Sequence, residues 1–207
     1  MAKRDYHDLL KPEVINTVSG LSLISRIVVE GYTSGLHRSK SVGPGMEFSQ
    51  YRGYEPGDDL RLLDWKMLAR SGRYYIKQSE VESHVTVKFI VDASASMEHK
   101  EDGISKLEFA RVMVACLSHM AQKQGDSVGL FALNEDDFVS IYPKADQKHF
   151  NRLLLELLKI STKGKWPELP IASRRIYNRG EKELVFFLTD MYEDVSELSD
   201  FVKNLKT

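Results

Sequence analysis

One carboxylate and two hydroxyl groups follow each other at a spacing of two residues near the middle of the chain. They belong to Asp92, Ser94 and Ser96, which come directly after the β-branched and apolar run 85–91. An extended or gently turning loop can direct these side chains toward one point. Their oxygens are the hard ligands that Mg²⁺ and Mn²⁺ prefer. The segment therefore predicts a divalent-cation site, with Asp92 as an exposed carboxylate at the end of a strand.

The same residue types also have an ordinary structural use, because Asp and Ser are common in turns and at helix N-caps. A second stretch favours the cation site. The predicted strand 184–189 ends at Asp190. Ligands of parallel α/β sheets bind beyond the carboxyl ends of the strands. We therefore expect Asp92 and Asp190 to meet at one edge of a sheet.

The elements that position these residues alternate between strands and helices. The hydrophobic patterns predict strands over residues 85–91, 127–133, 138–142 and 184–189, and helices over residues 104–124, 147–160, 170–177 and 194–206. This alternation predicts an α/β fold with a mostly parallel sheet that is flanked by helices.

The chain before this region is organised differently. Residues 12–31 have the apolar spacing of one or more helices. A turn-rich stretch follows, with predicted strands over 46–54 and 73–80 and a short helix that Asp64 caps. The expected division is an N-terminal helical segment over 1–34, a small β-containing region over 35–83 and the α/β domain over 84–207.

The charge composition of the chain argues against some classes of binding partner. The chain has 207 residues, with 29 Lys plus Arg against 30 Asp plus Glu, so no overall charge attracts nucleic acid or an anionic membrane. Residues 36–80 hold eight basic and six acidic side chains, which favours internal ion pairs over nucleic-acid binding. A single cysteine and the lack of a long apolar segment predict a cytoplasmic protein without a membrane span.

Short motifs between residues 35 and 97 occur in the order of a known bacterial family. They are Gly35-Leu-His-Arg-Ser39, Gly45-Met-Glu-Phe48, Arg52-Gly-Tyr54, Pro56-Gly-Asp-Asp-Leu-Arg61, Asp64-Trp-Lys66 and Ala69-Arg70. The chain from about residue 9 resembles the bacterial domain-of-unknown-function family 58. The segment Asp92-x-Ser94-x-Ser96-Met97 resembles the metal-ion-dependent adhesion site of von Willebrand factor type A domains.

The resemblance implies a von Willebrand factor type A-like (Rossmann-like) domain over residues 84–207. It also implies a non-enzymatic protein, often encoded beside a MoxR-type AAA ATPase, that binds partners or helps the ATPase to mature other proteins. Carried over residue by residue, the ligands of Mg²⁺ or Mn²⁺ are Asp92, Ser94, Ser96 and Asp190.

The usual threonine of such sites has no clear counterpart. Type A domains supply it from a Gly-x-Thr loop, and the nearest equivalent here is Gly164-Lys165-Trp166. Thr162 is a further candidate ligand. An ammonium group at Lys165 would repel a divalent ion.

The type A fold usually continues past its second aspartate strand with further strands, whereas only residues 194–206 remain here for one helix. We therefore expect a C-terminally truncated domain that lacks its last strands. The strand that ends at Thr189 would then lie at the edge of the sheet, where self-association is a risk.

Three functions remain open at this point. In the first, an acidic side chain of a protein partner completes the coordination of the bound cation. The second, a metal-dependent hydrolase or phosphotransferase, is disfavoured because no phosphate-binding loop, no His-Glu-x-x-His and no second aspartate two residues after Asp92 occur. The third is a scaffold whose metal site has decayed.

Overall fold

The computed structural model describes residues 9–36, 50–78, 85–167, 176, 183–192 and 195–204. The chain divides into two compact units. The large unit comprises residues 1–35 and 84–207, and the small unit comprises residues 36–83.

The large unit contains most of the secondary structure. Its described elements are, in chain order, α1 (Pro12–Ile15), α2 (Val18–Leu36), β3 (Thr86–Asp92), the 3₁₀ turn Ala95–Glu98, β4 (Lys100–Glu101), β5 (Ile104–Ser105), α4 (Lys106–Lys123), β6 (Ser127–Leu133), β7 (Phe138–Lys144), α5 (Gln147–Lys159), β8 (Glu183–Leu188) and α7 (Val195–Asn204). Of the predicted helix 170–177, only Ile176 lies within the described residues, where it is helical.

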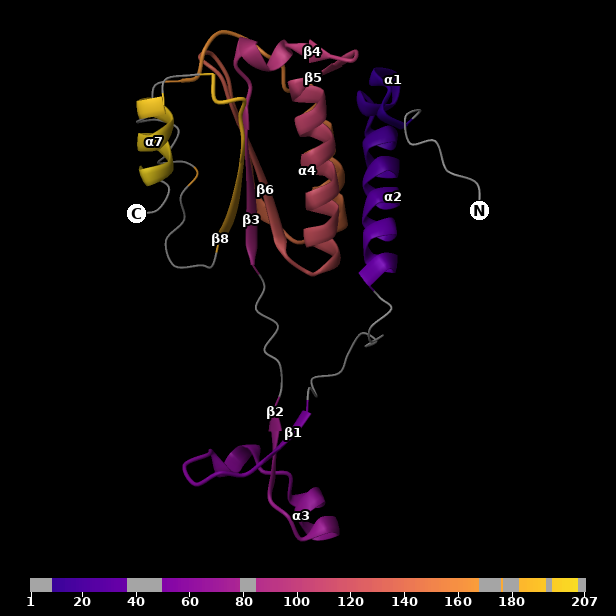
Figure 1. Ribbon diagram of the computed structural model, residues 1–207, viewed down its shortest axis with the longest axis vertical. Helices are drawn as coiled ribbons and strands as arrows, with labels where there is room; N and C mark the ends of the chain where they lie inside the picture. The colour runs from indigo at the N-terminus through magenta and orange to yellow at the C-terminus, as the bar shows by residue number, and fades with distance from the viewer. Residues whose placement is uncertain are drawn as a thin grey trace. The chain divides into compact units, whose positions relative to one another are not determined.

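A four-stranded sheet with the order β7-β6-β3-β8 forms the centre of this unit (Figure 1). The strand β3 is parallel to both β6 and β8, and β7 is antiparallel to β6. The predicted mixed α/β fold with a mostly parallel sheet is thus confirmed. Among the described strands, β8 pairs only with β3, so its other side is an edge.

The central strand β3 is buried on both faces, as its continuous apolar run predicts. Val87, Phe89 and Val91 belong to the large core cluster, which also holds side chains of α2, α4 and α5. On the opposite face, Ile90 packs in a smaller cluster that includes Phe201 of α7. The alternation of side chains along β3 therefore serves two separate cores.

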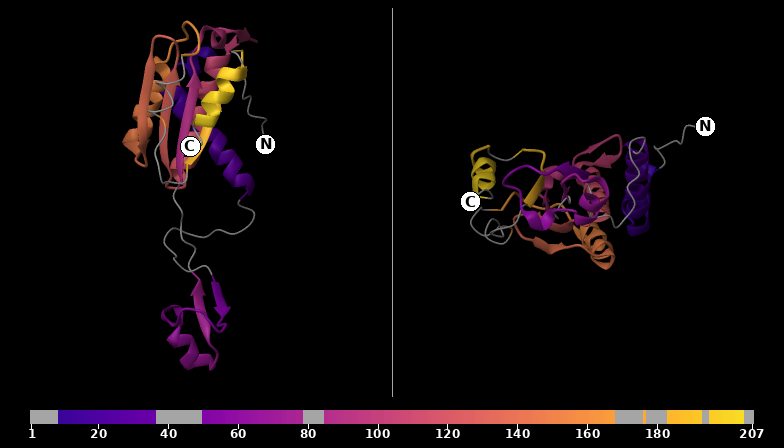
Figure 2. Two further views of the ribbon diagram at one scale, coloured as in Figure 1. Left: turned by 90° about the vertical axis from the view of Figure 1, so that its left-hand side faces the viewer. Right: turned by 90° about the horizontal axis from the view of Figure 1, so that it is seen from below.

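Helices cover the two faces of the sheet in layers. Figure 1 shows α4 against one face with α1 and α2 outside it, and α7 against the other face. Figure 2 shows α5 beside β7 and α7 in front of the sheet. This arrangement leaves the carboxyl ends of β3, β6 and β8 together at one end of the unit.

The start of α4 differs from the prediction, which placed the helix from residue 104. A two-residue turn with positive φ at Asp102 (49°) and Gly103 (83°) instead closes the short hairpin of β4 and β5. Helix α4 then begins at Lys106. Ser105 caps it, in a capping box with Glu108.

The N-terminal helices are joined to α4 by polar contacts. The Asn16 side chain donates to Glu108 Oε1 at 2.7 Å and accepts from Arg111 Nη1 at 2.6 Å. Arg111 also donates to the carbonyl of Ile160 at 2.7 Å, just after α5. These contacts connect three helices of the same face.

The small unit is a two-stranded antiparallel sheet with a short helix. It consists of β1 (Gln50–Gly53), the 3₁₀ turn Leu60–Leu62, α3 (Trp65–Ser71) and β2 (Tyr75–Gln78). Asp64 caps α3 by accepting from the amides of Lys66 and Met67, as predicted. Arg52 pairs with Asp58 at 2.7 Å. No described helix of either unit combines the length and the apolar composition that a bilayer crossing requires.

A buried ion pair on the α7 face of the sheet gives a stability prediction. Lys88 is 2% exposed, and its Nζ donates at 2.6 Å both to Glu183 Oε1 and to the carbonyl of Ile176. Lys88→Met leaves both acceptors without this donor, and we expect a loss of about 3 kcal/mol of unfolding free energy in urea. The double variant Lys88→Met/Glu183→Leu should recover at least about 1 kcal/mol. A double variant less stable than the single one would contradict this account.

The capping box gives a prediction for the pH dependence of stability. Burial alone would raise the pKa of Glu108, but hydrogen bonds from Ser105 and Asn16 outweigh it and hold this pKa below 4.5. Its stabilising contribution is therefore complete above pH 4.5 and is lost as the pH falls through the lowered pKa. The unfolding free energy, measured in urea, should fall less between neutral and acidic pH for Glu108→Gln than for the wild type. Equal acid losses would refute the assignment.

Candidate functional site

Asp92 lies at the carboxyl end of β3 and is fully buried (0% exposed). Its Oδ1 accepts from the backbone N–H of Ser94 at 2.9 Å, and its Oδ2 accepts from the hydroxyl of Thr189 at 2.8 Å. The expectation of an exposed carboxylate was wrong, because β8 and the following loop cover this strand end. Asp92 thus holds two loops together.

The two serine hydroxyls lie side by side beyond Asp92. Ser94 precedes the 3₁₀ turn Ala95–Glu98, and its Oγ is 3.0 Å from Ser96 Oγ. Two oxygens that bind one Mg²⁺ at about 2.1 Å and at right angles are about 3.0 Å apart. The spacing of the two hydroxyls therefore fits adjacent positions around one such ion.

Asp190 follows β8 and completes the group. The Ser96 hydroxyl donates to its Oδ1 at 3.1 Å, and Lys106 Nζ lies 2.6 Å from its Oδ2. Burial alone would raise the pKa of Asp190, but the hydrogen bonds from Lys106 and Ser96 outweigh it, so this pKa lies below 3.8. The structure thus brings Asp92, Ser94, Ser96 and Asp190 together at one end of the sheet.

Two contacting residues were missed by the sequence reasoning. Thr189 was treated only as the end of a strand, and Lys106 only as part of a helix. The Thr-Asp pair that follows an apolar strand was the available signal for Thr189. Lys106 had no local signal, because its position depends on the β4–β5 hairpin and on a contact 84 residues away in sequence.

The loop after α5 runs alongside the serine loop. The amide of Lys163 donates to the carbonyl of Ala93, and the amide of Ala95 donates to the carbonyl of Gly164, both at 2.9 Å. The hydroxyl of Thr162 donates to Glu98. The structure therefore places Thr162 next to the site, with its hydroxyl engaged by a carboxylate outside the predicted ligand set.

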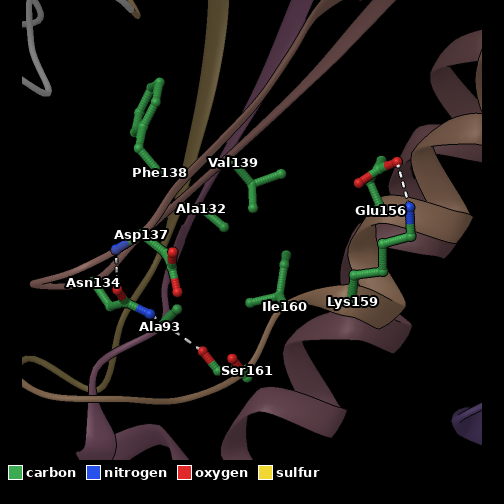
Figure 3. Close-up of a pocket in the computed structure, with 10 residues that line it drawn as sticks. All are labelled: Ala93, Ala132, Asn134, Asp137, Phe138, Val139, Glu156, Lys159, Ile160 and Ser161. Carbon is green, nitrogen blue, oxygen red and sulfur yellow. Dashed lines mark hydrogen bonds and ion pairs between the residues drawn. The ribbon is translucent and has the colours of Figure 1, made fainter.

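A pocket of about 760 Å³ reaches Ser96 and Asp190, and its lining also includes Lys106 and Lys165. Asp92 and Ser94 do not line it and are buried, at 0% and 1% exposed. A second pocket of about 310 Å³ lies between the ends of β6 and β7 and helix α5 (Figure 3). There, buried Asn134 donates to the carbonyl of Ser161 at 3.3 Å. This second pocket contains none of the predicted ligands, and its Asn134 helps to position the loop that carries Thr162.

Other reactive groups do not form a site in the part of the chain that is described. Burial raises the pKa of the Cys116 thiol to about 11, so this thiol is a poor nucleophile at neutral pH. No three described His, Cys, Asp or Glu side chains are grouped as a metal centre. A cation at the group described above would therefore depend on serine hydroxyls as well as carboxylates.

The comparisons with known proteins match this chain to one family. A model of the family described as "Protein of unknown function DUF58" matches residues 50–207. Uncharacterized proteins of Mycobacterium tuberculosis and Mycobacterium bovis are each 24% identical over 147 residues. Each match covers 71% of this chain and 46% of the relative, so the chain spans about half the length of the curated relatives it matches.

The bond from Thr189 to Asp92 gives a test of the site's internal support. Thr189→Val keeps the side-chain shape but leaves a buried carboxylate oxygen without its donor. We expect a loss of about 1–2 kcal/mol of unfolding free energy. Thr189→Ser keeps the hydroxyl and should lose less than half as much. Equal losses in the two variants, measured by urea unfolding, would show that the hydroxyl does not support Asp92.

Proposed function

The chain belongs to the DUF58 family, and from this premise we propose that its large unit is a cation-dependent protein-binding module of the von Willebrand factor type A kind. The order β7-β6-β3-β8 supports this proposal, because it makes β3, which ends at Asp92, and β8, which Asp190 follows, parallel neighbours. Residues 84–207 would then form the type A-like domain.

The observation that carries the proposal is the line of oxygens from Ser94 to Asp190. The distances of 3.0 Å between the two serine hydroxyls and 3.1 Å between Ser96 and Asp190 suit ligands of one small hard cation. Asp92 adds a buried carboxylate whose described donors are both neutral, an amide and a hydroxyl. A buried carboxylate with neutral partners favours a cation nearby.

The ligand set explains why binding, rather than catalysis, is proposed. Serine hydroxyls are neutral, so Mg²⁺ or Mn²⁺ held by them keeps part of its charge. An acidic side chain of a protein partner can then complete the coordination through the pocket that Ser96 and Asp190 line. We propose no hydrolytic or phosphoryl-transfer step.

The partner is proposed from the family resemblance. The resemblance implies a MoxR-type AAA ATPase and a role in protein maturation or complex assembly. Because the chain spans about half of the relatives it matches, this role is proposed for the protein to which the unit belongs.

A second candidate is a scaffold that binds partners without a metal. Two contacts favour it: Lys106 already neutralises Asp190 at 2.6 Å, and Thr162 is engaged by Glu98. In this alternative the same residues hold the loops in place, and the partner recognises the protein surface alone.

Cation binding is tested by removing hydroxyls without changing charge. Ser94→Ala/Ser96→Ala should weaken Mn²⁺ binding at least about tenfold, or 1.4 kcal/mol, in calorimetry. Ser140→Ala, on β7 away from the site, is the matched control and should bind as the wild type does. Asp92→Ala is a less direct test, because it also removes the acceptor of the Ser94 amide and of the Thr189 hydroxyl. Equal Mn²⁺ affinity in the double variant and the wild type would refute the metal site.

The two candidate functions differ in their response to a chelator. A pull-down with the wild type should recover a partner in Mg²⁺ and lose it in EDTA if the module is cation-dependent. Recovery of the same partner in both buffers would favour the scaffold.

A further inference from the structure

Lys106 makes a direct ion pair with a carboxylate of the proposed cation site. The Lys106 side chain is 41% exposed, whereas that of Asp190 is 8% exposed. Both Asp190 oxygens thus have a donor, since Ser96 occupies the other one. The backbone N–H of Tyr192 also donates to Oδ1, at 3.3 Å. Among these described donors, only Lys106 carries a full positive charge.

The backbone of Lys106 is fixed while its side chain is not enclosed. Its amide donates to the carbonyl of His99 at 3.0 Å, and it is the first residue of α4 after the β4–β5 hairpin. The flexible four-carbon stem and compact ammonium group of lysine allow the charged end to move while the backbone stays. The lysine side of the pair is partly exposed, so its ammonium group can leave Asp190 for solvent.

A divalent cation that is bound by Asp190 would lie close to the ammonium group of Lys106. The two cations would share one carboxylate, and like charges a few ångströms apart repel each other even when solvent screens them. The ion must therefore displace Lys106 from Asp190 or bind against its repulsion. In both cases the charge of Lys106 opposes the binding of the ion.

We propose that Lys106 regulates the cation site as a tethered competitor that holds Asp190 and is displaced when Mg²⁺ or Mn²⁺ binds. This inference rests on the proposed cation-binding function and deepens it, because it says what sets the affinity. The site responds to the concentration of divalent cation instead of holding an ion permanently.

Calorimetric titration with Mn²⁺ tests the competition directly. Lys106→Met keeps an unbranched side chain that is one atom shorter and removes its charge, and we expect it to bind Mn²⁺ about tenfold more tightly than the wild type. Lys106→Arg keeps the charge and should not gain affinity. Lys106→Met binding that is equal to the wild type, or weaker, would overturn the proposal.

The rise in melting temperature on addition of Mn²⁺ supplies a second readout that a merely structural lysine would not change. In EDTA, Lys106→Met should melt below the wild type because Asp190 has lost its counter-ion. Added Mn²⁺ should then raise the melting temperature of the variant more than that of the wild type. Equal increases in the two proteins would overturn the proposal.

Lys165→Met is the matched control for charge alone. Lys165 lines the same pocket, and its described contact is through its backbone amide to Glu135 at 3.2 Å. Its replacement should raise the Mn²⁺ affinity less than Lys106→Met does. Equal increases would attribute the effect to overall charge and overturn the competition at Asp190.

The titrations also separate this inference from the function on which it rests. Wild-type binding that Ser94→Ala/Ser96→Ala loses and Lys106→Met does not improve would overturn the inference alone. Binding by Lys106→Met but not by the wild type would support it in its strongest form. If neither protein binds Mn²⁺, the proposed metal site fails and the inference fails with it.

Discussion

The parallel pairing of β3 with β8 is the constraint on which the candidate site depends. Its register sets Val91 opposite Leu188, so the next residues along the two strands, Asp92 and Thr189, lie side by side and share a hydrogen bond of 2.8 Å. Because side chains alternate between the faces of a strand, a shift of one residue would turn either partner away. The two hydrophobic cores on either side of β3 fix this register. The register in turn fixes the positions of the polar side chains that follow β3 and β8.

The electrostatics of the site follow from which donors reach its two carboxylates. Asp92 is buried with an amide and a hydroxyl as its described partners, whereas Asp190 holds the ammonium group of Lys106. The pair therefore combines a carboxylate that has only neutral described donors with one that has a counter-ion. In the proposed function, a divalent cation would take its charged ligands from this pair, and the two serine hydroxyls would add oxygens that carry no charge.

Much of this arrangement could be predicted from local patterns. Continuous apolar runs gave the central strands, and the spacing of Asp92, Ser94 and Ser96 after one of them placed three oxygens together. The burial of Asp92 could not be foreseen, because it depends on how the loop after β8 closes over the strand end. The contact of Lys106 was equally hidden, since an Asp-Gly turn shifts the start of α4 by two residues and directs that helix terminus at the site. No periodic pattern in the local sequence predicts such long-range contacts.

The choice between a cation-dependent module and a metal-independent scaffold depends in large part on the positive charge that Asp190 holds. A tethered ammonium group has a high effective concentration at its carboxylate, because its encounter is intramolecular. A divalent ion has twice its charge and gains the Ser94 and Ser96 hydroxyls as additional ligands, but it must come from solution. The same fold and the same loops serve both states. In the proposed cation-dependent module, occupancy of the site would therefore depend on the surrounding ion concentration and on the balance between the charge of Lys106 and the two serine hydroxyls.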